Sequence, residues 1–181
     1  MSEIKTISGM MIDPARPRPE LIAISDIAHA LSMLCRANGH FIHFYSVGQH
    51  CLNCAAEAKA RGYSRRIQLA CLLHDASEAY LSDVTRPVKE ELPAYLTIEK
   101  PLQDMIWLKY LGTPLTAEEE KQVFEIDDEM LYFEFEHLGE MALIDRAPRL
   151  KREPELDFTG FSDTKRNFLM LFERLSHGQN G

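Results

Sequence analysis

The pair His74-Asp75 is the strongest candidate for chemistry in this sequence, because it directly follows the apolar run at residues 69–73. An ionised carboxylate at the end of a buried apolar segment is costly unless it is paired or bound to a cation. Imidazole and carboxylate together suit Zn²⁺, Mn²⁺, Co²⁺ or Fe²⁺. The alternative is structural: Asp75 forms an ion pair and His74 forms a hydrogen bond in the core.

Two further positions bring metal-ligand side chains to apolar helix faces. His50 interrupts a helix face that is otherwise apolar. Farther along the chain, Asp127 falls in the middle of the apolar arc of its segment and Asp128 at its edge, at about 100° of rotation per residue. The structural alternatives are a hydrogen-bonded core histidine for His50 and a buried cap or salt bridge for Asp127. Three helices thus each carry ligand-type groups on an apolar face.

Four motifs, in chain order, resemble those of the HD-domain metal-dependent phosphohydrolases. They are similar above all to the bacterial 5'-deoxynucleotidase-like HD proteins. The motifs are DIAHAL at 26–31 followed by Cys35-Arg36, YSVGQH at 45–50, HDASEA at 74–79 and SDVTRPVK at 82–89. The resemblance covers roughly residues 20–140. It departs from the usual pattern at Gln49, Cys51 and Ser82, where Glu, Ser and Gly are common.

The resemblance implies one divalent metal ion as cofactor, drawn from Mn, Co, Zn, Fe, Mg and Ni. The residues that match its four protein ligands are His50, His74, Asp75 and Asp127. Glu78 matches an acidic residue one helical turn after the HD pair, so it faces the same site and would orient or deprotonate a water. Asp83 matches a second acid near the nucleophile or the sugar. Glu78 and Asp83 are therefore the candidate catalytic residues.

Three basic residues are candidates for binding the phosphate of a substrate. Arg36 matches a phosphate-binding arginine in the opening helix of the family. Arg86 and Lys89 lie in the segment after the HD motif, where their charges would neutralise a phosphate. The alternative for Arg86 and Lys89 is a solvated loop with no role in the site.

The activity implied by the resemblance is removal of phosphate from a nucleoside 5'-monophosphate or a similar small phosphomonoester. Hydrolysis of a phosphodiester or of a signalling nucleotide is the alternative among enzymes. A non-catalytic HD protein that senses a nucleotide is the alternative outside them. Relatives that bind two metals usually use extra histidines as ligands. In this chain His29 is the main further histidine within a helix, so one metal is expected rather than two.

The elements that position these residues are predicted to be helices, which gives an all-α HD-domain bundle of about six helices. They are predicted over residues 26–38, 47–61, 65–80, 94–111, 117–138 and 162–176. Ser25, Ser64 and Ser162 are predicted N-caps, and capping boxes are predicted at Ser46 with Gln49 and at Thr116 with Glu119. Pro101 should kink a helix or start a new one. Residues 1–24 are predicted to form an irregular or short-stranded arm, and residues 82–93 mostly a loop.

The length and charge of the chain limit its class. Its 181 residues suit a single domain, with the core expected at about residues 20–140. The net charge of −8 argues against a general binder of nucleic-acid polymers or anionic membranes, which needs a basic face. No signal peptide or membrane-spanning run is recognisable, so a cytoplasmic location is expected. The expected partners are a small phosphorylated substrate and, in a homodimer, a second copy of the chain.

Overall fold

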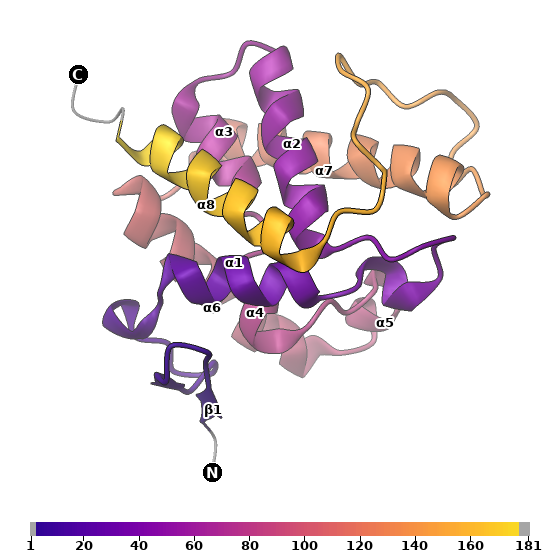
Figure 1. Cartoon of the computed structure of the whole chain (residues 1–181). Coiled ribbons are helices and arrows are strands. Elements are labelled where there is room, and N and C mark those ends of the chain that lie inside the picture. The colour runs from indigo at the N-terminus through magenta and orange to yellow at the C-terminus, as the bar shows by residue number, and fades with distance from the viewer. Residues whose placement is uncertain (1–2, 178–181) are drawn as a thin grey trace.

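Helices form most of the regular structure in the computed structural model, which describes residues 3–177 (Figure 1). The helices of this part of the chain are α1 (Ile24–Met33), α2 (Val47–Ala60), α3 (Arg65–Leu72), α4 (Glu78–Leu81), α5 (Arg86–Glu90), α6 (Pro93–Leu111), α7 (Ala117–Leu138) and α8 (Phe161–Ser176). An N-terminal arm carries two antiparallel strands, β1 (Ile4–Lys5) and β2 (Met11–Ile12), and the 3₁₀ turn η1 (Pro19–Leu21). The predicted all-α class with a short β arm is therefore confirmed.

Local signals set several helix ends as predicted. Ser46 and Gln49 form the capping box of α2, and Thr116 and Glu119 form that of α7. The Ser64 hydroxyl accepts a hydrogen bond from the backbone of Ile67 and so caps α3. Each cap satisfies backbone N–H groups that have no partner within the helix.

Two predicted caps are wrong. Helix α1 begins after Ala23 rather than after Ser25, and it ends at Met33 because Leu34 is extended. The residues that follow form a separate 3₁₀ turn, η2 (Arg36–Gly39), in which all three residues after Arg36 have positive φ. Helix α8 begins after Gly160, without the predicted Ser162 cap.

The single helix predicted over residues 65–80 is interrupted where the metal-ligand pair lies. Helix α3 ends at Leu72, and the chain turns before it resumes as α4. The Gln103 amide on α6 satisfies the interrupted backbone: it donates to the Leu73 carbonyl at 2.8 Å and accepts from the Ser77 N–H at 3.0 Å. The prediction missed this break, because its stabilising partner lies some thirty residues away in sequence.

Two other predictions need correction in the following segment. Residues 82–93, predicted mostly as loop, contain the short helix α5, whose first turn includes Pro87. Proline fits that position because it lacks only an N–H that would have no partner there. Pro101 lies inside α6, which is a single helix from Pro93 to Leu111, so Pro101 does not start a new helix.

The core lies around α3, as the all-round apolar run predicts. All five residues at positions 69–73 are fully buried. Helix α2 packs against α3, and α8 packs against α1 while also contacting α2 and α3 (Figure 1). Within residues 3–177, no helix has the length and apolar character needed to cross a membrane.

The close approach of three helices at Gly48 gives a stability test. An added Cβ at Gly48 would lie 2.9 Å from Cγ2 of the buried Thr164 and 3.2 Å from the Leu31 backbone. Overpacking typically costs about 1–3 kcal/mol, while Gly to Ala in a helix gains about 1 kcal/mol. We therefore expect Gly48→Ala to lower the free energy of unfolding in urea. The double variant Gly48→Ala/Thr164→Ser should recover part of the loss, and a Gly48→Ala protein of unchanged or higher stability would contradict this packing.

Candidate metal centre

Four side chains from three parts of the fold meet at one buried point. His50 comes from α2, His74 and Asp75 from the break after α3, and Asp127 from α7. His50 Nε2 lies 3.1 Å from His74 Nε2 and 3.0 Å from Asp127 Oδ1. His74 Nε2 lies 3.3 Å from Asp75 Oδ2 and 3.4 Å from Asp127 Oδ1. The structure thus brings together the four predicted metal ligands.

The spacing of these four side chains fits a single metal ion. Donor atoms about 2.1 Å from one ion and at right angles to each other lie about 3.0 Å apart. The separations given above are between 3.0 and 3.4 Å, and that between His50 Nε2 and Asp75 Oδ2 is 3.8 Å. The Asp75 Oδ2 atom is buried and accepts no hydrogen bond from any described residue. A buried carboxylate oxygen without a donor is the group that a cation would stabilise.

Hydrogen bonds on the far side of each imidazole turn both Nε2 atoms toward the centre. His50 Nδ1 lies 2.7 Å from Glu134 Oε1, and His74 Nδ1 lies 2.7 Å from the Cys71 carbonyl. Such bonds fix the tautomer and ring orientation of metal-binding histidines. Glu134, which is fully buried, was missed in the sequence. The sequence feature that could have identified Glu134 is its position seven residues after Asp127, which places both residues on the same face of one helix.

Arg36 is held by the centre rather than standing free for a phosphate. Its Nε donates to Glu134 Oε2 at 2.7 Å, whereas its terminal nitrogens lie 3.6 Å from Asp75 and 3.8 Å from Asp127. The short ion pair is therefore with Glu134. Arg36 makes no equally close contact with Asp75 or Asp127. A purely structural ion pair with Arg36 would therefore leave the negative charges of these two carboxylates incompletely neutralised.

The carboxyl groups of the site have divergent pKa values. Burial opposes ionisation of Asp75, but the combined effects of the neighbouring His74 and His50 outweigh it and lower the pKa of Asp75 to about 2. Burial likewise opposes ionisation of Asp127, yet hydrogen bonds with His50 and His74 hold its pKa well below the usual range. In Glu78, burial and the nearby charges of Asp75 and Asp83 raise the pKa well above the usual range. Carboxyl groups with pKa values pushed apart are typical of acid–base sites.

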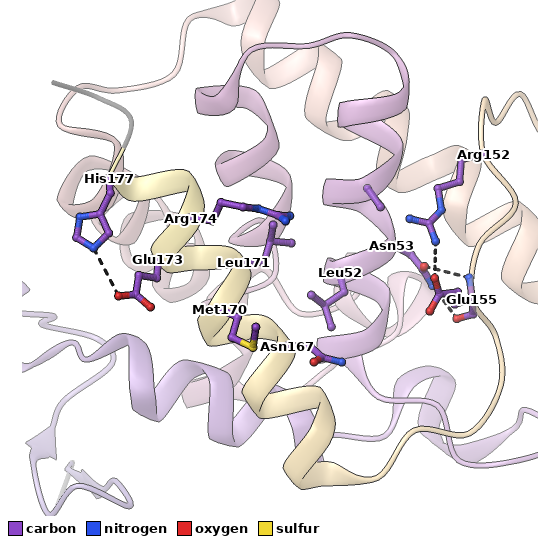
Figure 2. Close-up of a pocket in the computed structure, with 11 residues that line it drawn as sticks. Leu52, Asn53, Arg152, Glu155, Asn167, Met170, Leu171, Glu173, Arg174 and His177 are labelled. Atoms are coloured by element: carbon purple, nitrogen blue, oxygen red, sulfur yellow. Dashed lines mark hydrogen bonds and ion pairs between the residues drawn. The ribbon is translucent and has the colours of Figure 1, made fainter. Parts of the chain in front are cut away.

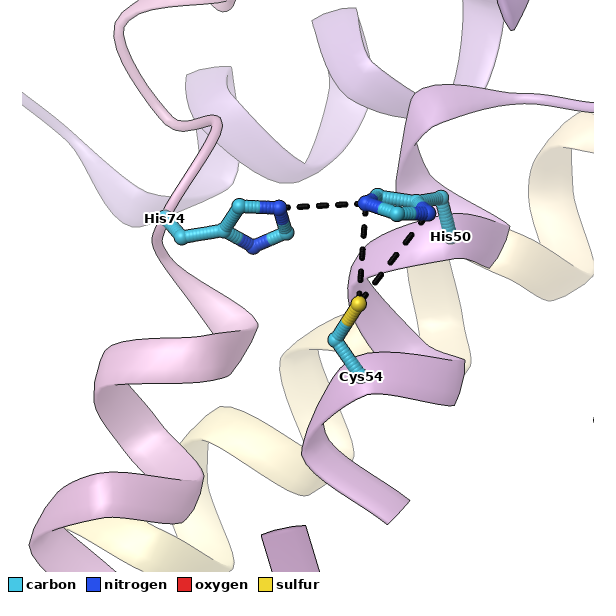
Figure 3. A group of neighbouring side chains, drawn as sticks. All are labelled: His50, Cys54 and His74. Atoms are coloured by element: carbon cyan, nitrogen blue, oxygen red, sulfur yellow. Dashed lines mark hydrogen bonds between the residues drawn. The ribbon is translucent and has the colours of Figure 1, made fainter. Parts of the chain in front are cut away.

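Cysteine side chains form the inner wall of the centre, a second feature that the sequence did not reveal. Cys51 and Cys54 could each join His74 in a three-residue metal group, with Asp75 or His50 respectively. Figure 3 shows the Cys54 sulfur beside the His50 ring while the two imidazoles face each other.

The position of the Cys54 sulfur favours the carboxylates as ligands. Its Sγ lies 3.5 Å from His50 Nε2 and 4.0 Å from Nδ1, so the two distances differ little. An atom on the lone-pair axis of Nε2 would be roughly 2 Å farther from Nδ1 than from Nε2. The sulfur therefore lies alongside the ring, whereas Asp127 and His74 face Nε2 directly.

A cavity of about 490 Å³ opens above the centre. The seven remaining predicted site residues line it: Arg36, Asp75, Glu78, Asp83, Arg86, Lys89 and Asp127. His50 and His74 lie buried beneath them. The structure therefore brings all nine predicted site residues into one place, which sits within the usual size range of small-molecule sites, about 300–1,000 Å³.

The basic residues of the cavity rim are paired with acids rather than solvated alone. Lys89 Nζ lies 2.6 Å from Glu99 and 3.9 Å from Glu78 Oε1. Arg86 lies 2.7 Å from Asp128 and 3.9 Å from Asp127 Oδ2. Both residues belong to α5 rather than to a loop and lie at the cavity, although the Arg86 side chain remains 54% exposed.

The segment between α4 and α5 begins with a residue in an unusual backbone conformation. Ser82 has φ of 73°, in the left-handed region that favours glycine. Glycine is the common residue at this position in the motif that the sequence resembles. Asp83, the next residue, lines the cavity, where burial raises its pKa.

A larger cavity of about 690 Å³ lies elsewhere, between α2, α8 and the segment before α8 (Figure 2). Its charged side chains are largely paired with each other: Arg152 with Glu155, and His177 with Glu173. It contains none of the predicted site residues. Volume alone therefore does not identify the reactive site in this fold.

Comparisons with known proteins do not assign an activity. No protein-family profile matches the chain. The Escherichia coli (strain K12) "Uncharacterized protein YfdR" is 40% identical over 114 residues, which cover 63% of this chain and 61% of that protein. The Rhodobacter capsulatus "Uncharacterized protein RCAP_rcc00048" is 37% identical over 116 residues, covering 61% and 58% respectively. The chain thus matches less than two thirds of the length of either curated relative.

The choice between carboxylate and thiol ligands can be tested by metal analysis. We expect Asp127→Asn to lose most of the Mn²⁺ or Co²⁺ retained after dialysis, because it removes a charged oxygen at the centre. Asp128→Asn is the matched control, and Cys54→Ala should keep the metal. Loss of metal in Cys54→Ala with retention in Asp127→Asn would identify the thiol as the ligand instead.

The support of His50 by Glu134 gives a separate expectation. Glu134→Gln keeps the size of the side chain but removes the charge that orients the imidazole. Replacing such a partner typically lowers metal affinity about 10–100-fold. Titration of the metal-free protein with Co²⁺ would measure the change, with the exposed Glu136→Gln as control. Equal affinities in the two variants would show that Glu134 has no role at the centre.

Proposed function

We propose that this chain is an HD-type metal-dependent phosphohydrolase that acts on a nucleoside 5'-monophosphate or a similar small phosphomonoester. The observation that carries the proposal is the position of Glu78. Its carboxyl group lies at one cavity with both carboxylate ligands, Asp75 and Asp127. The proposed mechanism needs these groups at one place, and the order of the motifs in the sequence supports the same activity.

The buried ligand set supports the metal part of the proposal. His50, His74, Asp75 and Asp127 would hold one divalent ion, although the identity of that ion is open among Mn, Co, Zn, Fe, Mg and Ni. A divalent ion bound there would polarise a phosphoryl oxygen and lower the pKa of water. Asp75 and Asp127 would be neutralised by the ion, which removes their repulsion toward a phosphate.

Glu78 is the residue best suited to hold and transfer a proton. Its Oε2 atom is buried and has no hydrogen-bond partner among the described residues. Burial and the charges of Asp75 and Asp83 raise its pKa well above the usual range, and a raised pKa is typical of carboxyl groups that transfer protons in catalysis. We assign Glu78 the orientation of the attacking water, with Asp83 beside it at the cavity wall.

The cations of the rim would bind the phosphate. Lys89 and Arg86 are each more than a fifth exposed at the side chain and lie near the acids of the centre. A phosphate placed at the metal would offer their N–H groups charge-assisted hydrogen bonds. Arg36, which is tied to Glu134, would contribute mainly positive charge beneath the phosphate. We also propose a cytoplasmic location, which the four free cysteines support.

A panel of phosphate esters tests the proposed activity. With Mn²⁺, Co²⁺ or Mg²⁺ we expect release of inorganic phosphate from nucleoside 5'-monophosphates. We expect no comparable turnover of bis(p-nitrophenyl) phosphate, a phosphodiester. Turnover of the diester alone would favour the phosphodiesterase alternative. Tight nucleotide binding without turnover of any ester would favour a sensor.

The role of Glu78 gives a second test on the same assay. We expect Glu78→Gln to lower kcat about 10²–10⁴-fold, the usual contribution of general acid–base catalysis. Metal content should be retained, because Glu78 is not among the four ligands. Glu136→Gln on the outer surface of α7 is the control. Wild-type kcat in Glu78→Gln would remove this residue from the mechanism.

A further inference from the structure

The cavity above the candidate metal centre is lined by two chemically different sets of residues. One set is the charged residues discussed above. The other set, here called the apolar side, consists of the apolar and aromatic residues on and after α7: Leu131, Tyr132, Phe135, Met141 and Leu143. The first three belong to α7, and the last two belong to the non-helical segment that follows it. One cavity therefore offers both charged groups and apolar surface.

The apolar side is left partly uncovered. Met141 is 52% exposed and Leu143 is 41% exposed, although both line the cavity. Apolar surface in contact with water is unfavourable, and contiguous apolar surface beside polar groups commonly marks a binding site. A ligand with an apolar face would cover both side chains while its charged end reached the metal ligands.

The segment that carries Met141 and Leu143 is fastened to α7. The buried Glu129 accepts hydrogen bonds from the Arg146 guanidinium at 2.6 and 3.0 Å, and from the Arg149 backbone N–H at 2.7 Å. The Met141 N–H donates to the Phe135 carbonyl at 3.0 Å. The Arg146 guanidinium also lies 5.9 Å over the Tyr132 ring. These contacts hold the apolar side at a fixed place relative to Asp127, which is on the same helix.

We propose that Met141 and Leu143, together with the facing surface of α7, form a subsite for the base of a nucleoside 5'-monophosphate. The subsite determines the preference of the site for nucleotides over phosphates that lack a base. Arg146 is its positioning residue, because its ion pair with Glu129 anchors the segment. This inference rests on the proposed function, since it places the phosphate at the metal centre.

The chemistry of a nucleotide matches the two sides of the cavity. A nucleobase is flat and largely apolar on its faces, and every base can pack on aromatic or apolar side chains. Its phosphate carries the negative charge that Arg86 and Lys89 would bind. A sugar phosphate without a base would fill the charged side and leave Met141 and Leu143 exposed.

Binding of two probes tests the inference. The full chain carrying Glu78→Gln, loaded with Mn²⁺, is titrated calorimetrically with adenosine 5'-monophosphate and with ribose 5-phosphate. We expect the nucleotide to bind about tenfold more tightly or better, as stacking of one base allows. Adding Met141→Ser/Leu143→Ser should lower the nucleotide affinity about tenfold and bring the ratio of the two affinities near one. Arg146→Ala should lower the same ratio.

The matched control is Phe158→Ser, since Phe158 is an exposed residue beyond the cavity in the same inter-helix segment. It should leave both affinities unchanged. Equal affinities for the two probes, no binding of the nucleotide, or an equal loss of both in the Met141→Ser/Leu143→Ser protein would overturn the subsite. Preferential nucleotide binding in a chain that hydrolyses no phosphomonoester would support the subsite while overturning the proposed function.

Discussion

The burial of several charges at one point is the constraint on which this structure depends. Two carboxylates, two imidazoles and a guanidinium meet beneath the cavity, and a sixth group, Glu134, lies fully buried among them. Each uncompensated buried charge costs several kcal/mol, so each of these groups needs a partner that compensates its charge. Glu134 is satisfied by Arg36 and His50 at 2.7 Å each. The carboxylates of Asp75 and Asp127 contact the Nε2 atoms of His74 and His50 instead. They are therefore the carboxylates available to a cation.

The fold around this point provides what such a cluster needs. The apolar run of α3 excludes water from below, and its interruption at Leu73 turns His74 and Asp75 toward the centre. The break is stable because the Gln103 amide replaces the hydrogen bonds that a continuous helix would have made. Gly48 lets α1, α2 and α8 approach closely near His50. His50 and Asp127 are thus held by packed helices, and His74 and Asp75 by a break that Gln103 fixes, which favours a fixed geometry.

Sequence reasoning succeeds here where the cause is local or periodic. The boxes at Ser46 and Thr116 depend on residues three positions apart, and the apolar face of α7 correctly picked Asp127 over Asp128. Sequence reasoning fails where tertiary contacts determine the local backbone structure. The break after α3 depends on Gln103, and the true start of α1 is not visible from Ser25. Glu134 escaped notice because it lies among aromatic residues, although its spacing from Asp127 placed it on the same face.

Helix α7 explains how a metal centre and an apolar wall come to share one cavity. Asp127 and Glu129 are two positions apart, which is about 200° of helical rotation, so they face nearly opposite sides. Asp127 points to the centre, while Glu129 binds Arg146 and Arg149 on the outer side. The chain must therefore fold back along α7, and the positive φ of Glu140 begins that reversal. Because Met141 lies directly after this turn, the geometry that anchors the segment outside the helix also brings an apolar side chain to the cavity.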